Sequence, residues 1–206
     1  MGWPPPEIGL APAFLGQVLR SGDSAFVVSF NDTAHLNAKP TDDQSTLARA
    51  LQQMAGMRPG YGTALYDAIG AACRVPTRPN FHHVLVVLTD GQDNSSQHTR
   101  EEAMDVARGT GTTLYLMGHD AETGRVETAG RGFKVMREMA SATGGAYFGA
   151  LSKSDAESAF DSLAHILRAE YALDFQPSLL PKKDQQIRVR CSRKGVRLIA
   201  PDLLAK

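Results

Sequence analysis

The stretch that decides the fold reads Val84-Leu85-Val86-Val87-Leu88-Thr89-Asp90-Gly91-Gln92-Asp93-Asn94-Ser95-Ser96. Its first half is an uninterrupted apolar run rich in β-branched residues, which is typical of a strand buried on both faces of a parallel sheet. Its second half changes to Asp, Gly, Asn and Ser, which form turns and carry oxygen acceptors. Open α/β sheets bind their ligands at the carboxyl ends of the strands. Asp90 is therefore the first candidate for a binding residue.

The composition is that of an ordinary globular domain. The 206 residues fit one α/β domain, and 22 Lys and Arg balance 22 Asp and Glu, which argues against binding to nucleic acid or to an anionic membrane. No apolar run approaches the roughly 20 residues that span a bilayer, so we expect no transmembrane segment. The Pro-rich start lacks the basic and apolar regions of a signal peptide, and the localisation stays unknown.

Helical and strand patterns alternate between residues 13 and 170. This order predicts an α/β fold with a doubly wound, mainly parallel, Rossmann-like sheet. The expected helices cover residues 13–20, 43–55, 63–74, 99–108, 133–142 and 155–170. The expected strands cover residues 25–30, 84–89, 112–117 and 146–148, and a short edge strand at 35–39, stopped by Pro40, closes a hairpin with the first. The polar segment 120–131 is expected to be an exposed loop.

The two ends of the chain differ from this middle part. Residues 1–12 are rich in Pro and Gly and are expected to be an unstructured leader, because Pro donates no ladder hydrogen bond. After residue 170 the segments 171–176, 186–191 and 196–200 follow one another like antiparallel strands, with no helix between them. We predict three parts: a leader at 1–12, the α/β domain at 13–170 and a small C-terminal β extension at 171–206.

A second informative stretch is Gly60-Tyr61-Gly62-Thr63-Ala64-Leu65-Tyr66-Asp67-Ala68-Ile69. Thr63 offers a hydroxyl at the start of an expected helix, and Asp90 offers a carboxylate at the end of a strand. Mg²⁺ takes oxygen ligands and usually keeps several waters, so one hydroxyl and one carboxylate form part of a Mg²⁺ shell.

These stretches resemble the von Willebrand factor A domain, and in detail its bacterial VWFA-related subgroup. The resemblance rests on residues 28–32, 62–69 and 89–96, continues through 142–145 and covers about residues 13–200. It implies a metal ion at the carboxyl edge of the sheet that leaves one coordination position for an acidic group of a protein partner. Such a site serves adhesion or assembly rather than catalysis. By position, Thr63 and Asp90 match the ligands of the family's second and third metal loops.

The chain departs from the family pattern at its beginning. In the family, a central strand and then the first metal loop, Asp-x-Ser-x-Ser, precede the first helix. In this chain, neither the strand nor the loop is found before the helix expected at 13–20. We therefore expect an N-terminally truncated domain whose sheet leaves a gap between strands 25–30 and 84–89 or pairs them directly. With only Thr63 and Asp90 left of the shell, we expect Mg²⁺ or another divalent cation to bind weakly or not at all. Family members often carry export signals, which suggests export for a full-length form.

Each candidate residue also has a structural alternative. Thr63 is a good helix N-cap in its own right, and Asp90 is a good Asx-turn residue. Tyr61, between two glycines, either is an exposed aromatic at the binding face or stacks on its own loop. The other polar residues here are expected to position helices, loops and turns: Asp32, Asp67, Asp93, Asn94 and Ser95.

Enzyme motifs are missing from the sequence. It contains no Gly-x-Gly-x-x-Gly after a strand, no phosphate-binding loop and no Gly-x-Ser-x-Gly elbow. The six histidines and the two cysteines, Cys73 and Cys191, show no metal-binding spacing. The sequence favours a non-catalytic interaction module. A small metal-dependent hydrolase that uses Asp90 and a degenerate scaffold with no ligand are the alternatives.

Overall fold

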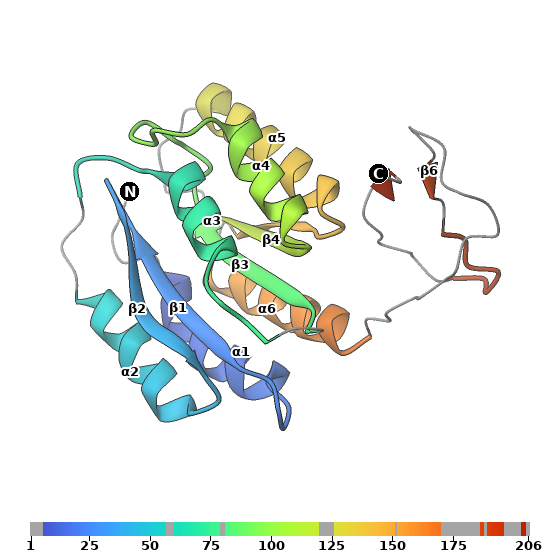
Figure 1. Ribbon diagram of the computed structural model, residues 1–206, viewed down its shortest axis with the longest axis horizontal. Coiled ribbons are helices and arrows are strands. Elements are labelled where there is room, and N and C mark those ends of the chain that lie inside the picture. The colour runs from blue at the N-terminus through green and yellow to red at the C-terminus, as the bar shows by residue number, and fades with distance from the viewer. Residues whose placement is uncertain are drawn as a thin grey trace.

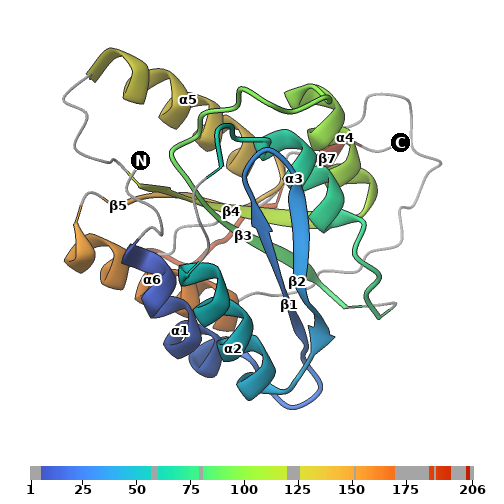
Figure 2. The same ribbon diagram turned by 90° about the vertical axis from the view of Figure 1, so that its left-hand side faces the viewer.

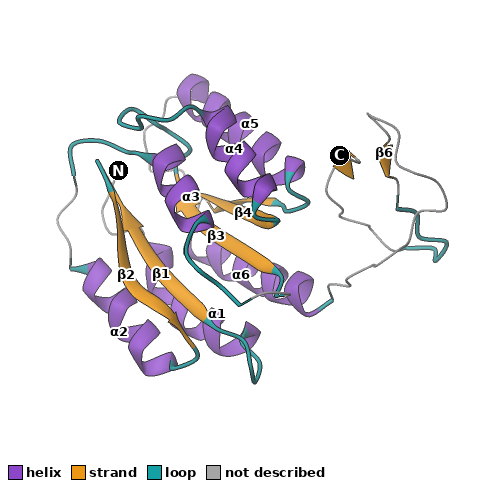
Figure 3. Ribbon diagram, viewed as in Figure 1, coloured by secondary structure: helices purple, strands orange, loops and turns teal. Residues whose placement is uncertain are grey.

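The computed structural model describes residues 6–56, 60–78, 81–119, 126–150, 152–169, 186–187, 189–195 and 203–204. Figures 1 and 3 show the arrangement of the helices and strands. The helices are η1 (Pro6–Leu10, a 3-10 helix), α1 (Ala11–Val18), α2 (Gln44–Ala55), α3 (Leu65–Cys73), α4 (Arg100–Gly109), α5 (Val126–Ala142) and α6 (Lys153–Arg168). The strands are β1 (Ala25–Phe30), β2 (Ala34–Thr41), β3 (His83–Thr89), β4 (Thr112–His119), β5 (Tyr147–Ala150), β6 (Gln186–Ile187) and β7 (Leu203–Leu204).

Strands β3, β4 and β5 form a parallel sheet with β4 in the middle. Figure 2 shows this sheet between two helix layers, with α3, α4 and α5 above it and α1, α2 and α6 below it. Side chains alternate between the layers along β4: Leu114 and Leu116 pack towards α3 and α4, whereas Tyr115 and Met117 pack towards α1 and α6. All four are almost completely buried, as a strand covered on both faces requires. The predicted α/β fold with a mainly parallel sheet is confirmed.

Strands β1 and β2 form the predicted antiparallel hairpin. The expectation that Pro40 stops the pairing is wrong, because β2 continues to Thr41, which lies opposite Ala25. The register shifts between Ala25 and Val27, so Pro40 lies at an irregularity of the ladder. A bulge tolerates a residue that has no N–H donor.

The strands of this domain form two sheets instead of one. Within the described strands, β1 pairs with β2 and not with β3. Of the two arrangements that we expected, a gap or a direct pairing of these strands, the structure has the gap. Two hydrogen bonds join segments that flank the two sheets: Ala64 N, just before α3, donates to the Asn31 carbonyl at 2.6 Å, and Arg78 Nη1, before β3, donates to the Gly22 carbonyl at 3.3 Å. Helix α3 lies over the boundary, where Phe30 of β1 packs on the same core as Leu65.

The N-terminal part is more ordered than predicted. Residues 6–12 form η1 and the start of α1, and Ile8 is buried against Leu47 and Leu51 of α2. The prediction of an unstructured leader is therefore wrong for these residues, and Met1–Pro5 lie outside the described residues. Proline excludes a central strand but is well suited to the first turn of a helix.

Helix α5 begins earlier than predicted. It starts at Val126, so the predicted loop is wrong for residues 126–131, while 120–125 lie outside the described residues. Gly132, the next residue of this helix, packs closely against the Asp90 backbone: a Cβ there would lie 2.9 Å from the Asp90 carbonyl oxygen. Tertiary packing thus outweighs the low helix propensity of glycine here.

The C-terminal segment contains a short antiparallel pair. Gln186 lies opposite Leu204 and Ile187 opposite Leu203. The strand predicted for 186–191 is shorter than expected, because residues 189–192 are not in a strand. The strands predicted at 171–176 and 196–200 lie outside the described residues. No helix in the described part of the chain is long and apolar enough to cross a membrane.

Candidate functional site

Three loops meet at the carboxyl edge of the two sheets: residues 31–33 after β1, 60–64 before α3 and 90–99 after β3. We call them the edge loops. The segment 60–64 binds both of the others, because Ala64 N donates to the Asn31 carbonyl while the Thr63 carbonyl accepts from Asn94 N at 3.0 Å and from Ser95 N at 3.2 Å. The edge loops therefore connect the two sheets at the position where α/β folds bind ligands.

Thr63 does not cap α3. The helix begins at Leu65, and Ala64 is its N-cap residue, which forms no side-chain cap hydrogen bond. The alternative in which Thr63 is the N-cap is therefore wrong. The backbone of Thr63 is fixed, since its N–H donates to Asn94 Oδ1 at 2.7 Å. Its hydroxyl forms no hydrogen bond with any described residue. Within the described part of the chain, the Thr63 hydroxyl thus has no structural partner.

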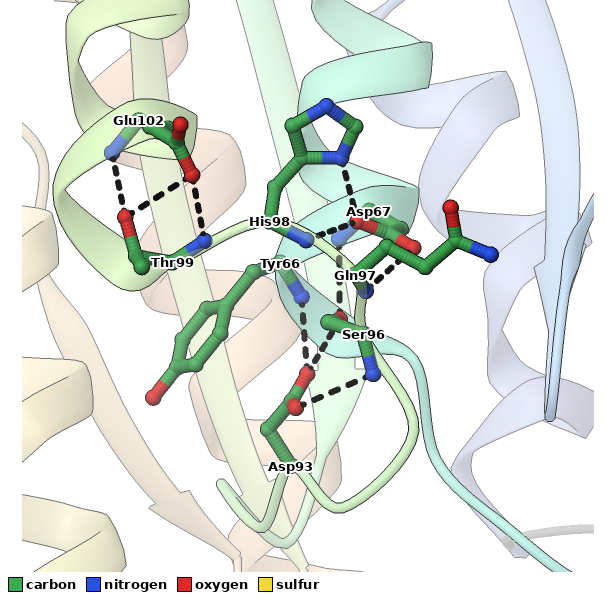
Figure 4. Close-up of polar contacts among 8 residues, drawn as sticks. All are labelled: Tyr66, Asp67, Asp93, Ser96, Gln97, His98, Thr99 and Glu102. Atoms are coloured by element: carbon green, nitrogen blue, oxygen red, sulfur yellow. Dashed lines mark hydrogen bonds and ion pairs between the residues drawn. The ribbon is translucent and has the colours of Figure 1, made fainter.

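The first turn of α3 is instead capped by the loop after β3 (Figure 4). Tyr66 N donates to Asp93 Oδ2 at 3.1 Å, and Asp67 N donates to Ser96 Oγ at 3.1 Å. Ser96 Oγ in turn donates to Asp93 Oδ2 at 2.5 Å. The first N–H groups of a helix have no partner within it, and a carboxylate there also interacts favourably with the helix dipole. Sequence reasoning missed this cap because its residues are distant in the chain.

Asp67 fixes the end of the same loop. Its carboxylate accepts hydrogen bonds from Gln97 N at 2.9 Å, His98 N at 3.0 Å and His98 Nδ1 at 2.7 Å. These bonds, led by that of the Gln97 backbone, hold the pKa of Asp67 below its usual value. The predicted loop-positioning role of Asp67 is confirmed.

Helix α4 begins directly after this contact. The Thr99 hydroxyl accepts from Glu102 N, and the Glu102 carboxylate accepts from Thr99 N at 2.7 Å, which makes a capping box. Of the predicted loop-shaping residues, Asp93 and Asn94 hold the loop to α3 and to Thr63, as expected.

Asp90 is half-buried at the end of β3 and forms the expected Asx-turn. Its Oδ1 accepts from Gln92 N at 3.1 Å. Its second carboxylate oxygen has no hydrogen bond to the described part of the chain. The turn therefore leaves one oxygen available, and the structural and ligand roles of Asp90 are compatible. Thr63 lies against the loop that Asp90 begins, although no hydrogen bond joins the two described side chains.

Asp32 and Tyr61 form the other side of the edge loops. Asp32 Oδ2 accepts from Tyr61 N at 3.3 Å, which gives Asp32 its predicted turn-shaping role. A Cβ on Gly62 would lie 1.9 Å from Ser95 Oγ and 2.4 Å from Asp32 Oδ1, so these side chains enclose the glycine. The side chain of Tyr61 is fully exposed, at 105%. It is an exposed loop aromatic, and the stacking alternative is wrong.

The free groups at this edge are oxygens, which is the ligand type that hard divalent cations prefer. Thr63 and Asp90 together supply a hydroxyl and a carboxylate oxygen, so they fit part of a Mg²⁺ shell. Among the described residues, no group of three or more His, Cys, Asp or Glu side chains could hold a metal ion. Cys73 is buried in the core, as expected for a small packing residue, and Cys191 is exposed.

Comparisons with known proteins agree with this fold. The von Willebrand factor type A domain matches residues 13–162 of the chain. None of the curated proteins matches the sequence. Among solved structures, BatB from Bacteroides thetaiotaomicron has a TM-score of 0.59 at 16% identity, over 79% of this chain and 87% of that one.

Two other solved structures share the fold. The von Willebrand factor type A protein from Catenulispora acidiphila has a TM-score of 0.58 at 20% identity, over 76% of this chain and 36% of that one. Proximal thread matrix protein 1 from the mussel byssus, with a zinc-occupied MIDAS motif, has a TM-score of 0.55 at 20% identity, over 78% of this chain and 38% of that one.

Domains of this type are typically interaction modules with a divalent-metal site. The family match covers most of the chain and includes all three edge loops. The chain therefore belongs to the von Willebrand factor type A domain family.

Proposed function

We propose that this chain is a non-catalytic interaction module that binds an acidic group of a protein partner through a divalent ion at the edge loops. Thr63 and Asp90 are the proposed protein ligands. The observation that carries the proposal is the contrast in hydrogen bonding within the described edge loops. Asp93 and Ser96 are committed to the α3 cap, while the Thr63 hydroxyl and one Asp90 oxygen are free.

The charge of the edge loops supports a metal-bridged contact. Their sequences contain three carboxylates, Asp32, Asp90 and Asp93, and no Lys or Arg. An acidic partner group is repelled by such an edge unless a cation lies between them. We propose Mg²⁺ as this cation. Since only two protein oxygens are assigned to it, we expect the ion to keep most of its waters and to bind weakly.

The proposal assigns this function to residues 13–170 and treats 171–206 as a separate β extension. It also assigns no chemistry to Asp90. Within the described residues, the Asp90 carboxylate is hydrogen-bonded only to the Gln92 N–H and has no histidine, cysteine or hydroxyl partner that would form a catalytic pair.

Paramagnetic line broadening by Mn²⁺ tests the proposal, because it detects weak sites. Trace Mn²⁺ is expected to broaden the amide signals of residues 62–64 and 90–96 first, and excess Mg²⁺ to restore them. Asp90→Asn and Thr63→Val should reduce this broadening. Asp105→Asn is the matched control, because Asp105 is an exposed carboxylate on α4 that pairs with Arg108.

The same measurement contains the result that would overturn the proposal. Broadening spread over the acidic surface, equal in the wild type and in Asp90→Asn, would mean that the edge loops hold no ion. Micromolar Mg²⁺ affinity in calorimetry would contradict the weak binding that two ligands imply.

A further inference from the structure

We infer that Tyr61 and Asp32 form a second contact point at the edge loops, which binds a Lys or Arg of the same partner segment. This inference rests on the proposed function and deepens it. The partner would present an acidic group to the ion held by Thr63 and Asp90, and a basic side chain to Tyr61 and Asp32.

The backbone around Tyr61 is held on both sides. A Cβ on Gly60 would lie 2.6 Å from Asn31 Cβ, and one on Gly62 would lie 1.9 Å from Ser95 Oγ, so both glycines permit close contact with neighbouring loops. The Tyr61 N–H donates to Asp32, which ties the residue to the turn after β1. An aromatic side chain on a fixed backbone loses little conformational entropy when it binds a partner.

The Tyr61 side chain has no packing role within the described part of the chain. Its exposure of 105% compares with 47% for Leu36 and 46% for Phe81, the next most exposed large hydrophobic side chains there. Phe81 already has a cationic partner, because the Arg78 guanidinium lies 5.9 Å from its ring centroid. No described Lys or Arg makes such a contact with Tyr61, and the 105% exposure of this residue leaves its ring accessible to a cation from outside.

The chemistry of this pair favours a basic partner residue. A Tyr ring attracts ammonium and guanidinium groups through its electron-rich face. Asp32 is exposed, and its Oδ1 has no hydrogen bond to a described residue, so it can accept a charge-assisted bond from the same group. The absence of Lys and Arg from the described edge loops leaves Asp32 without a competing ion pair there.

Selection from a random linear peptide library displayed on phage, with Mg²⁺ in excess, tests the inference. The wild type should enrich peptides that contain both an acidic and a basic residue. Tyr61→Ala and Asp32→Asn should retain the acidic residue and lose the basic one. Asp32→Asn keeps an oxygen acceptor for the Tyr61 N–H, so it removes the charge without releasing the loop.

Binding of one selected synthetic peptide makes the comparison quantitative. Tyr61→Ala should weaken it about two- to fivefold, as expected for an exposed cation–π contact. Phe81→Ala is the matched control, since it removes an exposed aromatic that is already paired with Arg78, and it should leave the affinity unchanged.

The outcomes separate this inference from the proposed function. Enrichment of acidic residues alone, equal in the wild type and in Tyr61→Ala, would overturn the inference and retain the metal-bridged contact. Enrichment of basic residues alone, abolished by Tyr61→Ala, would retain the contact point at Tyr61 and overturn the acidic-group proposal. No enrichment in the wild type would overturn both.

Discussion

The Asp93 carboxylate lies 3.1 Å from the backbone nitrogen of Tyr66, a residue 27 positions earlier in the chain. Through this contact the loop after β3 caps the helix that precedes β3. It satisfies the N–H of the first turn of α3 and leaves the Thr63 hydroxyl without a structural task. The contact between Asp93 and Tyr66 thus leaves the Thr63 side chain available for binding.

Removal of this cap should destabilise the domain. Asp93→Ala leaves Tyr66 N and the Ser96 hydroxyl without their acceptor, and we expect a loss of about 1–2 kcal/mol in the free energy of unfolding. Urea denaturation measures it. Asp105→Ala removes an exposed carboxylate and should cost less than about 0.5 kcal/mol. Equal effects of the two substitutions would mean that Asp93 does not cap α3.

Two threonines allow a matched test of the role of Thr63. Thr99 caps α4 with its hydroxyl, whereas the Thr63 hydroxyl caps no helix. Thr99→Val should therefore lower the free energy of unfolding by about 1 kcal/mol, and Thr63→Val by only a few tenths. Thermal and urea denaturation without divalent ions measure both. A large loss for Thr63→Val would show that its hydroxyl has a structural role.

The contribution of Asp67 to stability should depend on pH. Its hydrogen bonds from Gln97 and His98 hold its folded-state pKa below the ordinary value of 3.8. The stabilisation is therefore complete above about pH 5, where the unfolded carboxyl is ionised, and is lost as the pH falls through the lower folded pKa. The difference in unfolding free energy between the wild type and Asp67→Asn should be about 1 kcal/mol at neutral pH. It should decrease steadily below about pH 4. A difference that is constant with pH would contradict this account.

Gly62 should not tolerate a side chain. Gly62→Ala would bring a Cβ to 1.9 Å from Ser95 Oγ and 2.4 Å from Asp32 Oδ1, so the edge loops must move apart. We expect a loss of about 1–3 kcal/mol. Gly109→Ala serves as the control, because a Cβ there meets nothing within 4 Å and alanine is the better helix former. Denaturation curves that shift in opposite directions for the two variants would confirm the prediction.

The division of the strands into two sheets should be visible in hydrogen exchange. Strand β4 is paired on both sides, and its amides should exchange most slowly. Among the described strands, β1 is paired only with β2, so the amides of this hairpin should exchange faster and with a lower opening free energy. Exchange followed by NMR at low denaturant concentration measures both. Equal opening free energies would indicate a single cooperative unit.

Local patterns predict most of this fold. The apolar run at Val84–Thr89 indicates a buried strand because burial on both faces removes the need for polar residues. The positions of Thr63 and Asp90 at the edge loops follow in the same way from the ends of predicted elements. The resemblance to a known family adds the expectation of either a gap or a direct pairing between the strands at 25–30 and 84–89.

Contacts between distant residues account for what the sequence did not predict. The cap of α3 depends on Asp93 and Ser96, whose spacing from Tyr66 matches no local capping pattern. Helix α5 includes Gly132, which packs against the backbone of Asp90. Residues 6–12 are ordered because Ile8 is buried against α2. In each case tertiary contact decided the conformation against local propensity.

The separation of β1 from β3 has a consequence for the geometry of the edge loops. A ladder of hydrogen bonds fixes two strands in steps of whole residues, whereas side-chain packing permits small continuous displacements. Asp32 follows β1 and Asp90 follows β3, so the spacing between these two carboxylates is set without a ladder. Two adjacent residues, Thr63 and Ala64, bridge the two halves instead, because Thr63 is hydrogen-bonded to Asn94 and Ala64 to Asn31. The rigidity of this two-residue bridge thus limits how wide a partner group can lie between the two halves of the edge.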